Sequence, residues 1–421
     1  MSTNVHVDHE SLYKKTLACV HCGLCLPACP AYEAKPRESL APRGQVYNVR
    51  ALLEGRIELT EGLAEELYDC LACRGCESVC PAGVPVGNIM EEARGLITQE
   101  KKESALVRWA KRFLLAGVLA HPRRLALFMT LARWGDALGA RRLVGWVSPS
   151  LGERASLLPA VTKSAPLPER LESDGEPRKR VALFAGCIAS HLFADVNEAT
   201  VRVLQRNGYE VVAPKQQVCC GALHLHNGLP DTGRELAAKN IEAFKDFDAI
   251  IVNAAGCGAA LSEYGELLDS SPSATSFATR VVDISAFLVN EGFEAPQAPP
   301  AREPLRVAYD APCHLIHAQG VKAEPRELLS KIPGVELVDY PDSERCCGSA
   351  GIYNVTHYDM SMEVLESKMK DIVPAHPDII ATGNPGCHLQ LSEGVRRAML
   401  KAEVVHPVVL LDRAYRAEPD S

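Results

Sequence analysis

The stretch Cys19-Val-His-Cys-Gly-Leu-Cys-Leu-Pro-Ala-Cys29-Pro30 has a second copy, Cys70-Leu-Ala-Cys-Arg-Gly-Cys-Glu-Ser-Val-Cys80-Pro81. Both copies have the spacing C-x2-C-x2-C-x3-C-P, which is typical of a chain that wraps a [4Fe–4S] cluster. Three closely spaced thiolates hold one cluster, whereas the fourth cysteine characteristically reaches the cluster of the other run. The sequence therefore predicts two clusters, one held by Cys19, Cys22, Cys25 and Cys80, and one by Cys70, Cys73, Cys76 and Cys29.

Two other chemistries fit these eight cysteines less well. Cysteines separated by only two residues are badly placed to form disulfides with one another. Zinc sites are usually built from two CxxC pairs rather than from four thiolates followed by a proline. The duplication therefore favours two clusters, and we expect the rest of the chain to serve electron transfer to or from them.

Length and composition indicate an ordinary globular protein. The chain has 421 residues, of which 47% are hydrophobic and 23% are charged, so we expect roughly two to four domains. Its first ten residues contain no apolar segment of a secretory signal, and it has sixteen cysteines. These features predict a cytoplasmic protein that uses cysteine for metal ligation. The net charge of −8 argues against nucleic acid as a partner.

Residues 1–100 are expected to form a small α-helical module around the two clusters. Helical patterns occur at 46–54, between the cysteine runs, and at 88–100, after the second run. This is more helix than a minimal ferredoxin contains. The module therefore resembles the iron–sulfur subunits of respiratory dehydrogenases.

Residues 101–147 form a basic segment, with ten Lys or Arg against Glu103 and Asp136, and contain all three tryptophans, Trp109, Trp134 and Trp146. Basic amphipathic helices with tryptophan are used for peripheral binding to membranes, here to the inner face of the cytoplasmic membrane. The interpretation we favour is a pair of helices that cover the cluster module or a partner subunit. Residues 148–178 contain five prolines and are predicted to be a linker.

From residue 179 the chain repeats an alternation of short apolar strands and helices, in copies at 179–295 and 303–416. The first copy has predicted strands at 181–185, 210–213 and 249–253 and helices at 197–207 and 233–244. The second has predicted strands at 307–309, 336–339 and 378–381 and helices at 325–330 and 360–370. Such alternation indicates a parallel sheet covered on both faces. The fold class is therefore α+β and multidomain, with a helical two-cluster module followed by duplicated α/β domains.

The other eight cysteines follow predicted strands and include one Cys-Cys-Gly triplet in each copy. Because right-handed crossovers place the carboxyl ends of parallel strands at one edge, we expect four cysteines to converge there in each copy. Four thiolates suit one further iron–sulfur centre or a zinc ion per copy, and redox-active thiols without a metal are a third interpretation. The two sets are Cys187, Cys219, Cys220 and Cys257, and Cys313, Cys346, Cys347 and Cys387.

The ferredoxin pair, the duplicated Cys-Cys-Gly module and the run from Cys346 to Gly351 together resemble the glycolate oxidase iron–sulfur subunits. The wider family includes subunits of anaerobic glycerol-3-phosphate dehydrogenase, lactate-utilisation complexes and heterodisulfide reductase. The resemblance covers nearly the whole chain. It implies a partner FAD subunit that oxidises glycolate to glyoxylate, while this chain carries electrons toward a quinone-type acceptor. Lactate, another 2-hydroxy acid and glycerol 3-phosphate are the alternative substrates of that partner.

One departure from the wider family concerns disulfide chemistry. The catalytic subunit of heterodisulfide reductase ends each module with C-x-x-C, whereas the matching positions here are Ala260 and Gln390. This argues against disulfide reduction and leaves quinone reduction at the Cys-Cys-Gly centres as an alternative. The chain also lacks a complete dinucleotide fingerprint and a phosphate-binding loop, so FAD is expected on the partner.

Six histidines lie near the cysteines of the repeats and have two interpretations. They are candidates for proton delivery to a reduced quinone or for an additional ligand. The more ordinary interpretation is hydrogen bonding to cluster sulfur, or a plain role in a loop. These residues are His191, His224, His226, His314, His317 and His388.

Overall fold

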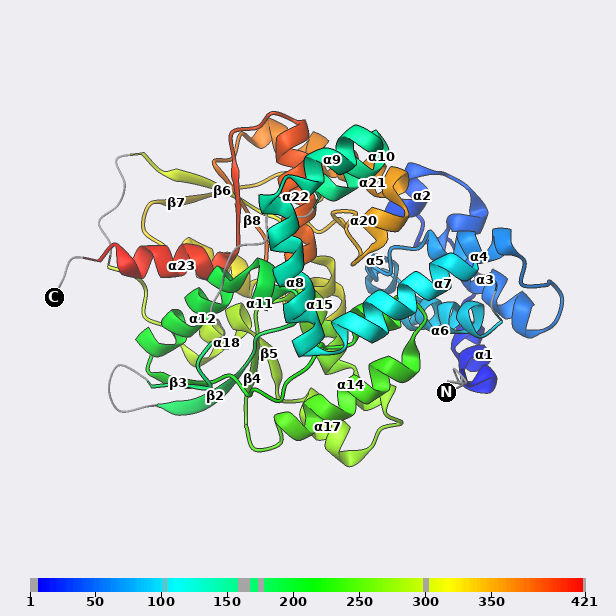
Figure 1. Cartoon of the computed structure of the whole chain (residues 1–421), viewed down its shortest axis with the longest axis horizontal. Coiled ribbons are helices and arrows are strands. Elements are labelled where there is room, and N and C mark those ends of the chain that lie inside the picture. The colour runs from blue at the N-terminus through cyan, green and yellow to red at the C-terminus, as the bar shows by residue number, and fades with distance from the viewer. Residues whose placement is uncertain are drawn as a thin grey trace.

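The computed structural model describes residues 7–100, 102, 104–157, 167–172, 178–297 and 303–418. A helical N-terminal module, blue in Figure 1, packs against two α/β units that run from green to red. The predicted fold class is confirmed, because both α/β units contain a parallel sheet.

The N-terminal module consists of short helices around a core that includes the buried residues Leu12, Val49 and Ile89. Both helices expected from the sequence are present, as α3 (Pro42–Leu53) and α6 (Val86–Gln99). The helix α3 begins earlier than its apolar pattern indicated because proline fits the first helical turn, where no N–H donor is needed. The other helices are α1 (His9–Leu17), α2 (Pro30–Ala34), η1 (Glu38–Leu40), α4 (Glu61–Tyr68) and α5 (Gly75–Ser78).

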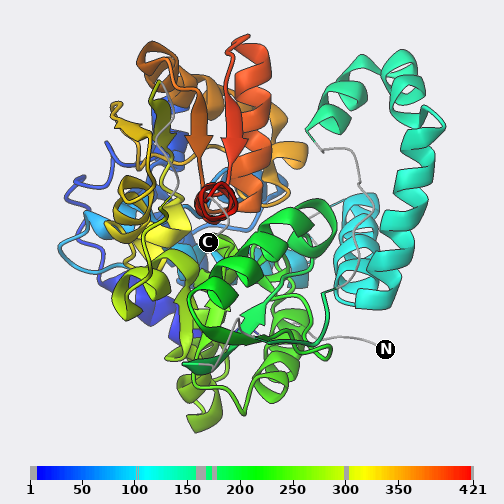
Figure 2. The same cartoon turned by 90° about the vertical axis from the view of Figure 1, so that its left-hand side faces the viewer.

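Five helical segments form an arc along one side of the molecule (Figure 2). Leu115 and Leu125 on the arc pack in the core around Cys219 of the first α/β unit, and Lys111 donates a hydrogen bond to Tyr68 of the N-terminal module. The expected covering helices are therefore present, with the first α/β unit as an additional surface that they cover. The segments are α7 (Ala105–Lys111), the π-helix η2 (Arg112–Leu119), α8 (Pro122–Ala137), α9 (Ala140–Val147) and α10 (Pro149–Ser156).

Within the described ranges, no single helix is long and apolar enough to cross a bilayer. The segments 105–119 and 122–137 pass a test of length and composition only as a pair, and this pair is bent by 107°.

The segment 148–178 contains more regular structure than a linker. The helix α10 starts with proline in its first turn, and β1 (Arg170–Leu171) pairs antiparallel with the neighbouring strand β3 (Tyr209–Val212). The linker prediction is wrong at these two places, because proline in a first helical turn starts a helix rather than interrupting one. Residues 158–166 and 173–177 of the predicted linker lie outside the described residues.

The first α/β unit has a sheet in the order β1-β3-β2-β4-β5, in which β1 alone runs antiparallel. The three predicted strands are confirmed as β2 (Lys179–Phe184), β3 (Tyr209–Val212) and β4 (Ile250–Val252), whereas β5 (Val281–Asp283) was not predicted. The predicted helices are α12 (Ala194–Arg206) and α14 (Pro230–Ala243). The remaining helices are α11 (Ala189–Leu192), α13 (Ala222–Leu225), α15 (Ala255–Ser262), α16 (Tyr264–Leu267), α17 (Pro272–Ala278) and α18 (Ile284–Glu291).

The second α/β unit repeats this topology with the order β7-β6-β8-β9, and all its described pairs are parallel. The predicted strands are β6 (Leu305–Tyr309), β7 (Val335–Val338) and β8 (Ile379–Ala381), and β9 (Glu403–Val405) was missed. The predicted helices are α19 (Glu324–Ser330) and α21 (Tyr358–Ile372). The others are η3 (His314–Ala318), α20 (Tyr353–Thr356), η4 (Val373–Ala375), α22 (Pro385–Arg397) and α23 (Pro407–Arg416).

The two α/β units share one hydrophobic core. On α12 and α23, Arg202 holds Asp412 through two hydrogen bonds of 2.8 Å each. The buried ring of His406 lies 3.0 Å from the carbonyl oxygen of Asn253. These contacts fix the carboxyl edges of the two sheets relative to each other.

Candidate metal centres

The eight N-terminal cysteines line two cavities. The first cavity is lined by Cys19, Cys22, Cys25 and Cys80, together with Cys76. The second is lined by Cys29, Cys70, Cys73 and Cys76. The cavities therefore bring together both sets expected from the sequence, with the fourth cysteine of each run exchanged. The positions support the ligand assignment, which stays a prediction.

Unusual backbone conformations bend the cysteine runs around these cavities. His21, Ala72 and Arg74 have positive φ angles of 57°, 50° and 64°, which residues other than glycine adopt rarely. Backbone N–H groups also point at sulfur, since Tyr32 donates to Cys29 Sγ at 3.5 Å and Ala72 to Cys70 Sγ at 3.4 Å. Such donors stabilise a thiolate.

Burial makes these thiols hard to ionise. Burial raises the pKa of Cys29 to about 12, and it raises the pKa of Cys70 and Cys76 as well. A bound metal centre provides the positive charge that stabilises such thiolates. Four soft sulfur ligands around each cavity fit a [4Fe–4S] cluster, which supplies one-electron transfer when bound.

In the first α/β unit, four cysteines meet at the carboxyl edge of the sheet. Cys187 follows β2, Cys219 and Cys220 follow β3, and Cys257 lies in α15 after β4. The sulfur atoms of Cys187 and Cys219 are 3.3 Å apart, as are those of Cys220 and Cys257. The structure therefore brings together the complete set expected from the sequence.

The second α/β unit gathers its four cysteines in the same way. Cys313 follows β6, Cys346 and Cys347 lie in the loop after β7, and Cys387 lies in α22. The sulfur atoms of Cys347 and Cys387 are 3.1 Å apart. At Gly348, φ is 91° and a Cβ atom would stand 2.6 Å from the carbonyl oxygen of Ser361. Glycine lets this loop pass close to its neighbour, as the triplet predicted.

The eight cysteines of the Cys-Cys-Gly sites form no disulfides. The eight N-terminal cysteines are likewise free of disulfides. Among the residues that the structure describes, no three Cys, His, Asp or Glu side chains are arranged as ligands of one metal ion. Both iron–sulfur centres and zinc ions bind to sets of four thiolates.

One cysteine joins the N-terminal module to the second α/β unit. The thiol of Cys73 makes a side-chain contact with Cys346, which also receives contacts from Cys313 and Cys347. Because these thiols donate to it, the pKa of Cys346 is lowered well below the usual value. A predicted cluster site and a Cys-Cys-Gly site are therefore neighbours in space.

The two positions that depart from the heterodisulfide reductase pattern are packed into the protein. Gln390 is fully buried, and its amide nitrogen donates to the hydroxyl oxygen of Ser361 at 2.9 Å. Ala260 is also buried, in the core of the first unit. The side chains of Ala260 and Gln390 therefore pack in the protein interior at the positions where heterodisulfide reductase has cysteines.

Five of the six histidines are held by polar contacts. His224 contacts the carbonyl oxygen of Leu115 at 3.0 Å, and His388 contacts that of Val404 at 2.6 Å. Burial lowers the pKa of His388 and of His314 to about 4, so both rings are neutral at physiological pH. His226 lies 2.7 Å from Glu91, His317 lies 2.6 Å from Ser78, and His314 lies 3.5 Å from Cys313. These contacts favour the structural interpretation.

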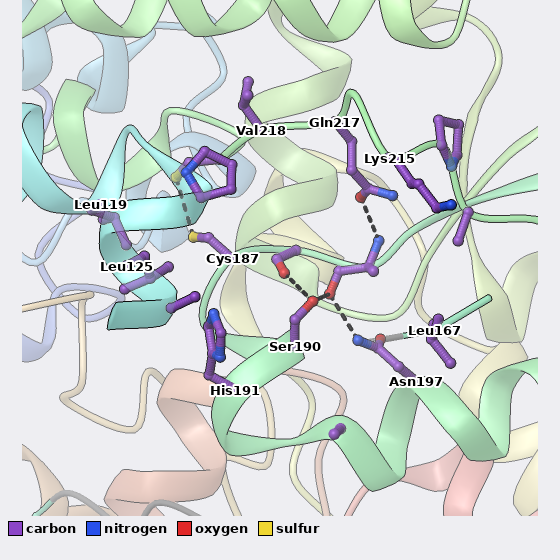
Figure 3. A pocket seen from close by; sticks show the side chains of 18 of the residues that line it. Leu119, Leu125, Leu167, Cys187, Ser190, His191, Asn197, Lys215, Gln217 and Val218 are labelled. Carbon is purple, nitrogen blue, oxygen red and sulfur yellow. Dashed lines mark hydrogen bonds between the residues drawn. The ribbon is translucent and has the colours of Figure 1, made fainter. Parts of the chain in front are cut away.

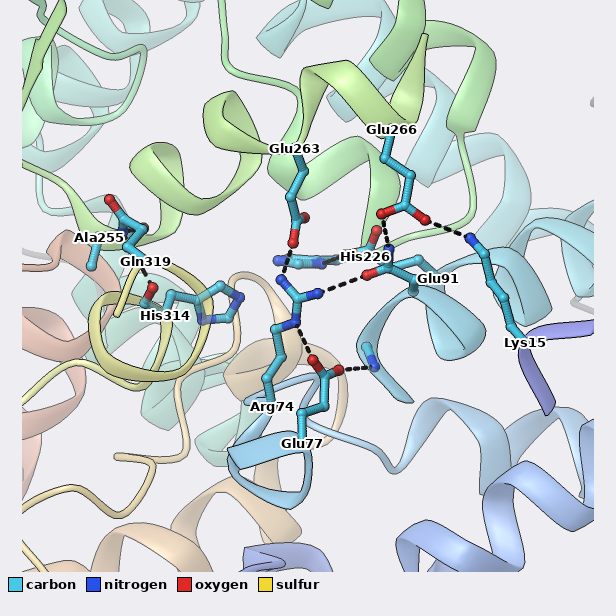
Figure 4. Close-up of polar contacts among 12 residues, drawn as sticks. Lys15, Arg74, Glu77, Glu91, His226, Ala255, Glu263, Glu266, His314 and Gln319 are labelled. Carbon is cyan, nitrogen blue, oxygen red and sulfur yellow. Dashed lines mark hydrogen bonds and ion pairs between the residues drawn. The ribbon is translucent and has the colours of Figure 1, made fainter. Parts of the chain in front are cut away.

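A partly buried polar network between the N-terminal module and the first unit was missed from the sequence (Figure 4). Arg74 forms ion pairs with Glu77, at 3.1 Å, and with Glu263. Lys15 joins Glu92 and Glu266, at 2.7 Å each. Arg74 and Glu77 are only three residues apart, but Glu263 and Glu266 are distant from Arg74 and Lys15 in the sequence. These longer-range pairs follow no spacing rule, so only the packing of the units reveals them.

Comparisons with known proteins agree with this division of the chain. The family described as 4Fe-4S dicluster domain matches residues 15–84, and the family described as Cysteine-rich domain matches residues 181–262 and again 307–392. The probable glycolate oxidase iron-sulfur subunit of Bacillus subtilis is 40% identical over 94% of this chain and 93% of its own length. The glycolate oxidase iron-sulfur subunit of Escherichia coli is 33% identical over 95% of this chain and 94% of its own length.

A more distant relative belongs to the dihydromethanophenazine:CoB–CoM heterodisulfide reductase of Methanosarcina barkeri. This relative is 27% identical over 92% of this chain and 90% of its own length. The cysteine sets, the duplicated α/β units and the near full-length identity to two relatives lead to one conclusion. The chain belongs to the family of glycolate oxidase iron–sulfur subunits.

Proposed function

We propose that this chain is the electron-transfer subunit of a glycolate-oxidising complex. A partner FAD subunit oxidises glycolate to glyoxylate, and this chain conducts the two electrons singly toward a quinone-type acceptor. The contact between Cys73 and Cys346 carries the proposal, because it connects the N-terminal module to a Cys-Cys-Gly site within one protein. The names of the Bacillus subtilis and Escherichia coli relatives supply the substrate.

We further propose that the sixteen cysteines hold four iron–sulfur centres. Cys19, Cys22, Cys25 and Cys80 form the first set, and Cys29, Cys70, Cys73 and Cys76 form the second. The two Cys-Cys-Gly sets hold the other two centres. The corresponding units are residues 1–100, 179–295 and 303–416.

The FAD subunit is proposed to dock beside the first cavity. Cys22 is exposed there, and the neighbouring Val20 and Leu24 are 72% and 58% exposed. Exposed apolar side chains next to a predicted redox site are suited to a protein partner that must bring its flavin close. Electrons would then enter at the first set and leave at the Cys-Cys-Gly sites.

Metal analysis of anaerobically purified protein tests the number of centres. Roughly twelve or more irons per chain with matching sulfide support iron–sulfur centres beyond the N-terminal pair. About eight irons with bound zinc would instead make the α/β units a structural scaffold.

Reduction by substrate tests the function itself. With the FAD subunit present, glycolate is expected to bleach the cluster absorbance of this chain. Lactate, other 2-hydroxy acids and glycerol 3-phosphate serve as competing substrates in parallel samples. If one of these compounds bleaches the clusters and glycolate does not, the chain is the electron-transfer subunit of a different dehydrogenase. If none of the compounds bleaches the clusters, the proposal is contradicted.

The arc is proposed to contact the cytoplasmic face of the membrane. Its tryptophans Trp109, Trp134 and Trp146 are exposed in the structure, and the segment carries an excess of basic residues. Tryptophan and basic side chains together favour the surface of an anionic bilayer.

A further inference from the structure

A cavity of about 320 Å³ opens beside the first Cys-Cys-Gly site (Figure 3). Cys187 and Cys219 are part of its wall. The arc contributes Leu119 at the end of η2 and Leu125 near the start of α8. The cavity thus lies between a predicted redox site and the helices that carry exposed apolar side chains, and its volume is at the lower end of the range for small-molecule sites.

The wall is mostly apolar, with a few polar groups. Gln217 and Asn197 are already engaged, because both hydrogen-bond the backbone of Ala185 at 2.9 Å. The ring of His191 forms no hydrogen bond with another residue in the described ranges, and burial lowers its pKa. Lys215 is paired with Glu169 at 3.3 Å. Among its described lining residues, the cavity therefore offers one neutral N–H donor from His191 and no buried cation for an anionic ligand.

We propose that this cavity is the acceptor site, in which a quinone head group lies against Leu119 and Leu125 with one carbonyl oxygen accepting a hydrogen bond from His191. This inference rests on the proposed function, which supplies the electrons. Two electrons arrive one at a time from the cysteine side, and water supplies two protons. The two C=O groups of the quinone become C–OH groups, so the quinone becomes a quinol, while the partner's reduced flavin is reoxidised.

The helix α8 connects the cavity to an apolar surface. Pro122, Leu125 and Ala126 at its start line the cavity. Further along the same helix, Leu127, Leu131 and Trp134 are 62%, 61% and 64% exposed. A ligand with a long apolar tail can therefore place its head group in the cavity and its tail along the arc. A freely soluble acceptor would not need such an apolar surface beside its binding site.

A cavity-filling substitution tests the site in the complete complex. Ala126 is exposed at the cavity wall, so Ala126→Trp adds volume there without entering a core. Ala137→Trp is the matched control, because Ala137 is an exposed alanine on the same helix that does not line the cavity. His191→Leu is a second variant, which removes the donor and keeps an apolar wall. Iron content and glycolate-driven bleaching are expected to match the parent protein in all three.

Binding is measured with decylubiquinone by equilibrium dialysis, and an azido derivative of the same quinone locates the site by photolabelling and peptide mapping. We expect Ala126→Trp and His191→Leu to weaken binding by about ten-fold or more, with Ala137→Trp unchanged. Labelled peptides should include residues from α8 or from the segment around His191. If both cavity variants bind decylubiquinone as tightly as the parent, or if the azido derivative labels other segments, the proposed quinone site is wrong. Failure of glycolate to bleach the clusters would instead refute the proposed function, and the binding data would still decide the cavity.

Discussion

The thiol of Cys73 in the N-terminal module contacts Cys346 at the carboxyl edge of the second sheet. The two α/β units are also linked close to their cysteines, since Asn384 accepts a hydrogen bond from the N–H of Gly256 at 3.1 Å. Gly256 precedes Cys257, and Asn384 donates to Cys387 at 3.4 Å. We therefore expect electrons to pass from the second N-terminal set to the second Cys-Cys-Gly site, and from there to the first.

Substitution of one cysteine in each Cys-Cys-Gly pair should interrupt this path. Cys220→Ser and Cys347→Ser each weaken one site while leaving both N-terminal sets intact. We expect quinone reduction with glycolate to fall by about ten-fold or more, while the absorbance and EPR signals of the N-terminal clusters persist. Normal turnover in both variants would show that the α/β units lie outside the path.

The ion pairs of Arg74 should contribute strongly to the attachment of the N-terminal module. Its side chain is 12% exposed and faces Glu77 and Glu263, which are 17% and 30% exposed, so Arg74→Met leaves two partly buried carboxylates without their partner. We expect a loss of about 3–5 kcal/mol in the free energy of unfolding. Lys14→Met, which removes an exposed pair with Glu10, should leave the free energy of unfolding nearly unchanged, because water and salt screen such pairs. Equal losses in anaerobic denaturation curves would contradict this prediction.

Gly348 is expected to tolerate no side chain. A Cβ atom there would stand 2.6 Å from Ser361 O, whereas Gly55 also has positive φ but has no atom within 4 Å of a Cβ. Gly348→Ala should therefore displace the loop of Cys346 and Cys347 and lower the metal content at that site. Gly55→Ala, the control for backbone strain alone, should cost about 1 kcal/mol and retain all metal. Metal analysis and thermal unfolding of the two variants test this prediction, and full metal content in Gly348→Ala would contradict it.

Acidification should destabilise the pairing of the α/β units through His406. Burial lowers the pKa of this ring to about 3 from a usual 6.5. Protonation therefore favours the unfolded chain, and stability present above pH 6.5 is lost as the pH falls toward 3. Between pH 7.5 and 5.5 this one group should cost about 1.4 kcal/mol.

His406→Asn isolates that effect. Asparagine can still accept from the N–H of Val408, as His406 Nδ1 does at 3.0 Å, but it does not titrate. The loss of melting temperature between pH 7.5 and 5.5 should become smaller in this variant. His376→Asn is the control at an exposed position with φ of 44°, and it should keep the parent's pH dependence. If the melting temperature of His406→Asn falls with pH as steeply as that of the parent, His406 is not the cause of the acid destabilisation.

The exposed side of α8 should bind anionic vesicles. Leu131→Ser combined with Trp134→Ser removes two large exposed apolar side chains, and we expect sedimentation with phosphatidylglycerol vesicles to weaken by about ten-fold. Met399→Ser is the control, because Met399 is 88% exposed and lies outside the arc. Unchanged vesicle binding with loss of the FAD subunit would show that the arc contacts a partner, in line with the sequence interpretation that these helices cover the cluster module or a partner subunit.

The parts of the structure that depend on local spacing could be predicted from the sequence. The cysteine runs lie close to their own cavities, and each Cys-Cys-Gly triplet follows a strand, so their convergence follows from the direction of parallel strands. The strands β5 and β9 were missed because each has only three residues and one of them is acidic, Asp283 or Glu403, whereas the equally short β4 and β8 are wholly apolar.

Contacts between the units could not be predicted, because they depend on how separately folded surfaces meet. No pattern in the sequence around Cys73 or around Cys346 indicates that the two residues are in contact. Arg74 is conspicuous only in the structure, where Glu263 from another unit lies beside it. The cavity beside Cys187 likewise requires the arc, whose cover over the first unit was not foreseen.

The cavities of the N-terminal module also bear on how the protein matures. Cys76 lines both of them, and Cys29 and Cys80 each line the cavity of the opposite run. Insertion of one cluster would therefore organise part of the binding loop for the other. We expect loading to be cooperative, so that a cell short of iron accumulates empty and fully loaded chains rather than half-loaded ones.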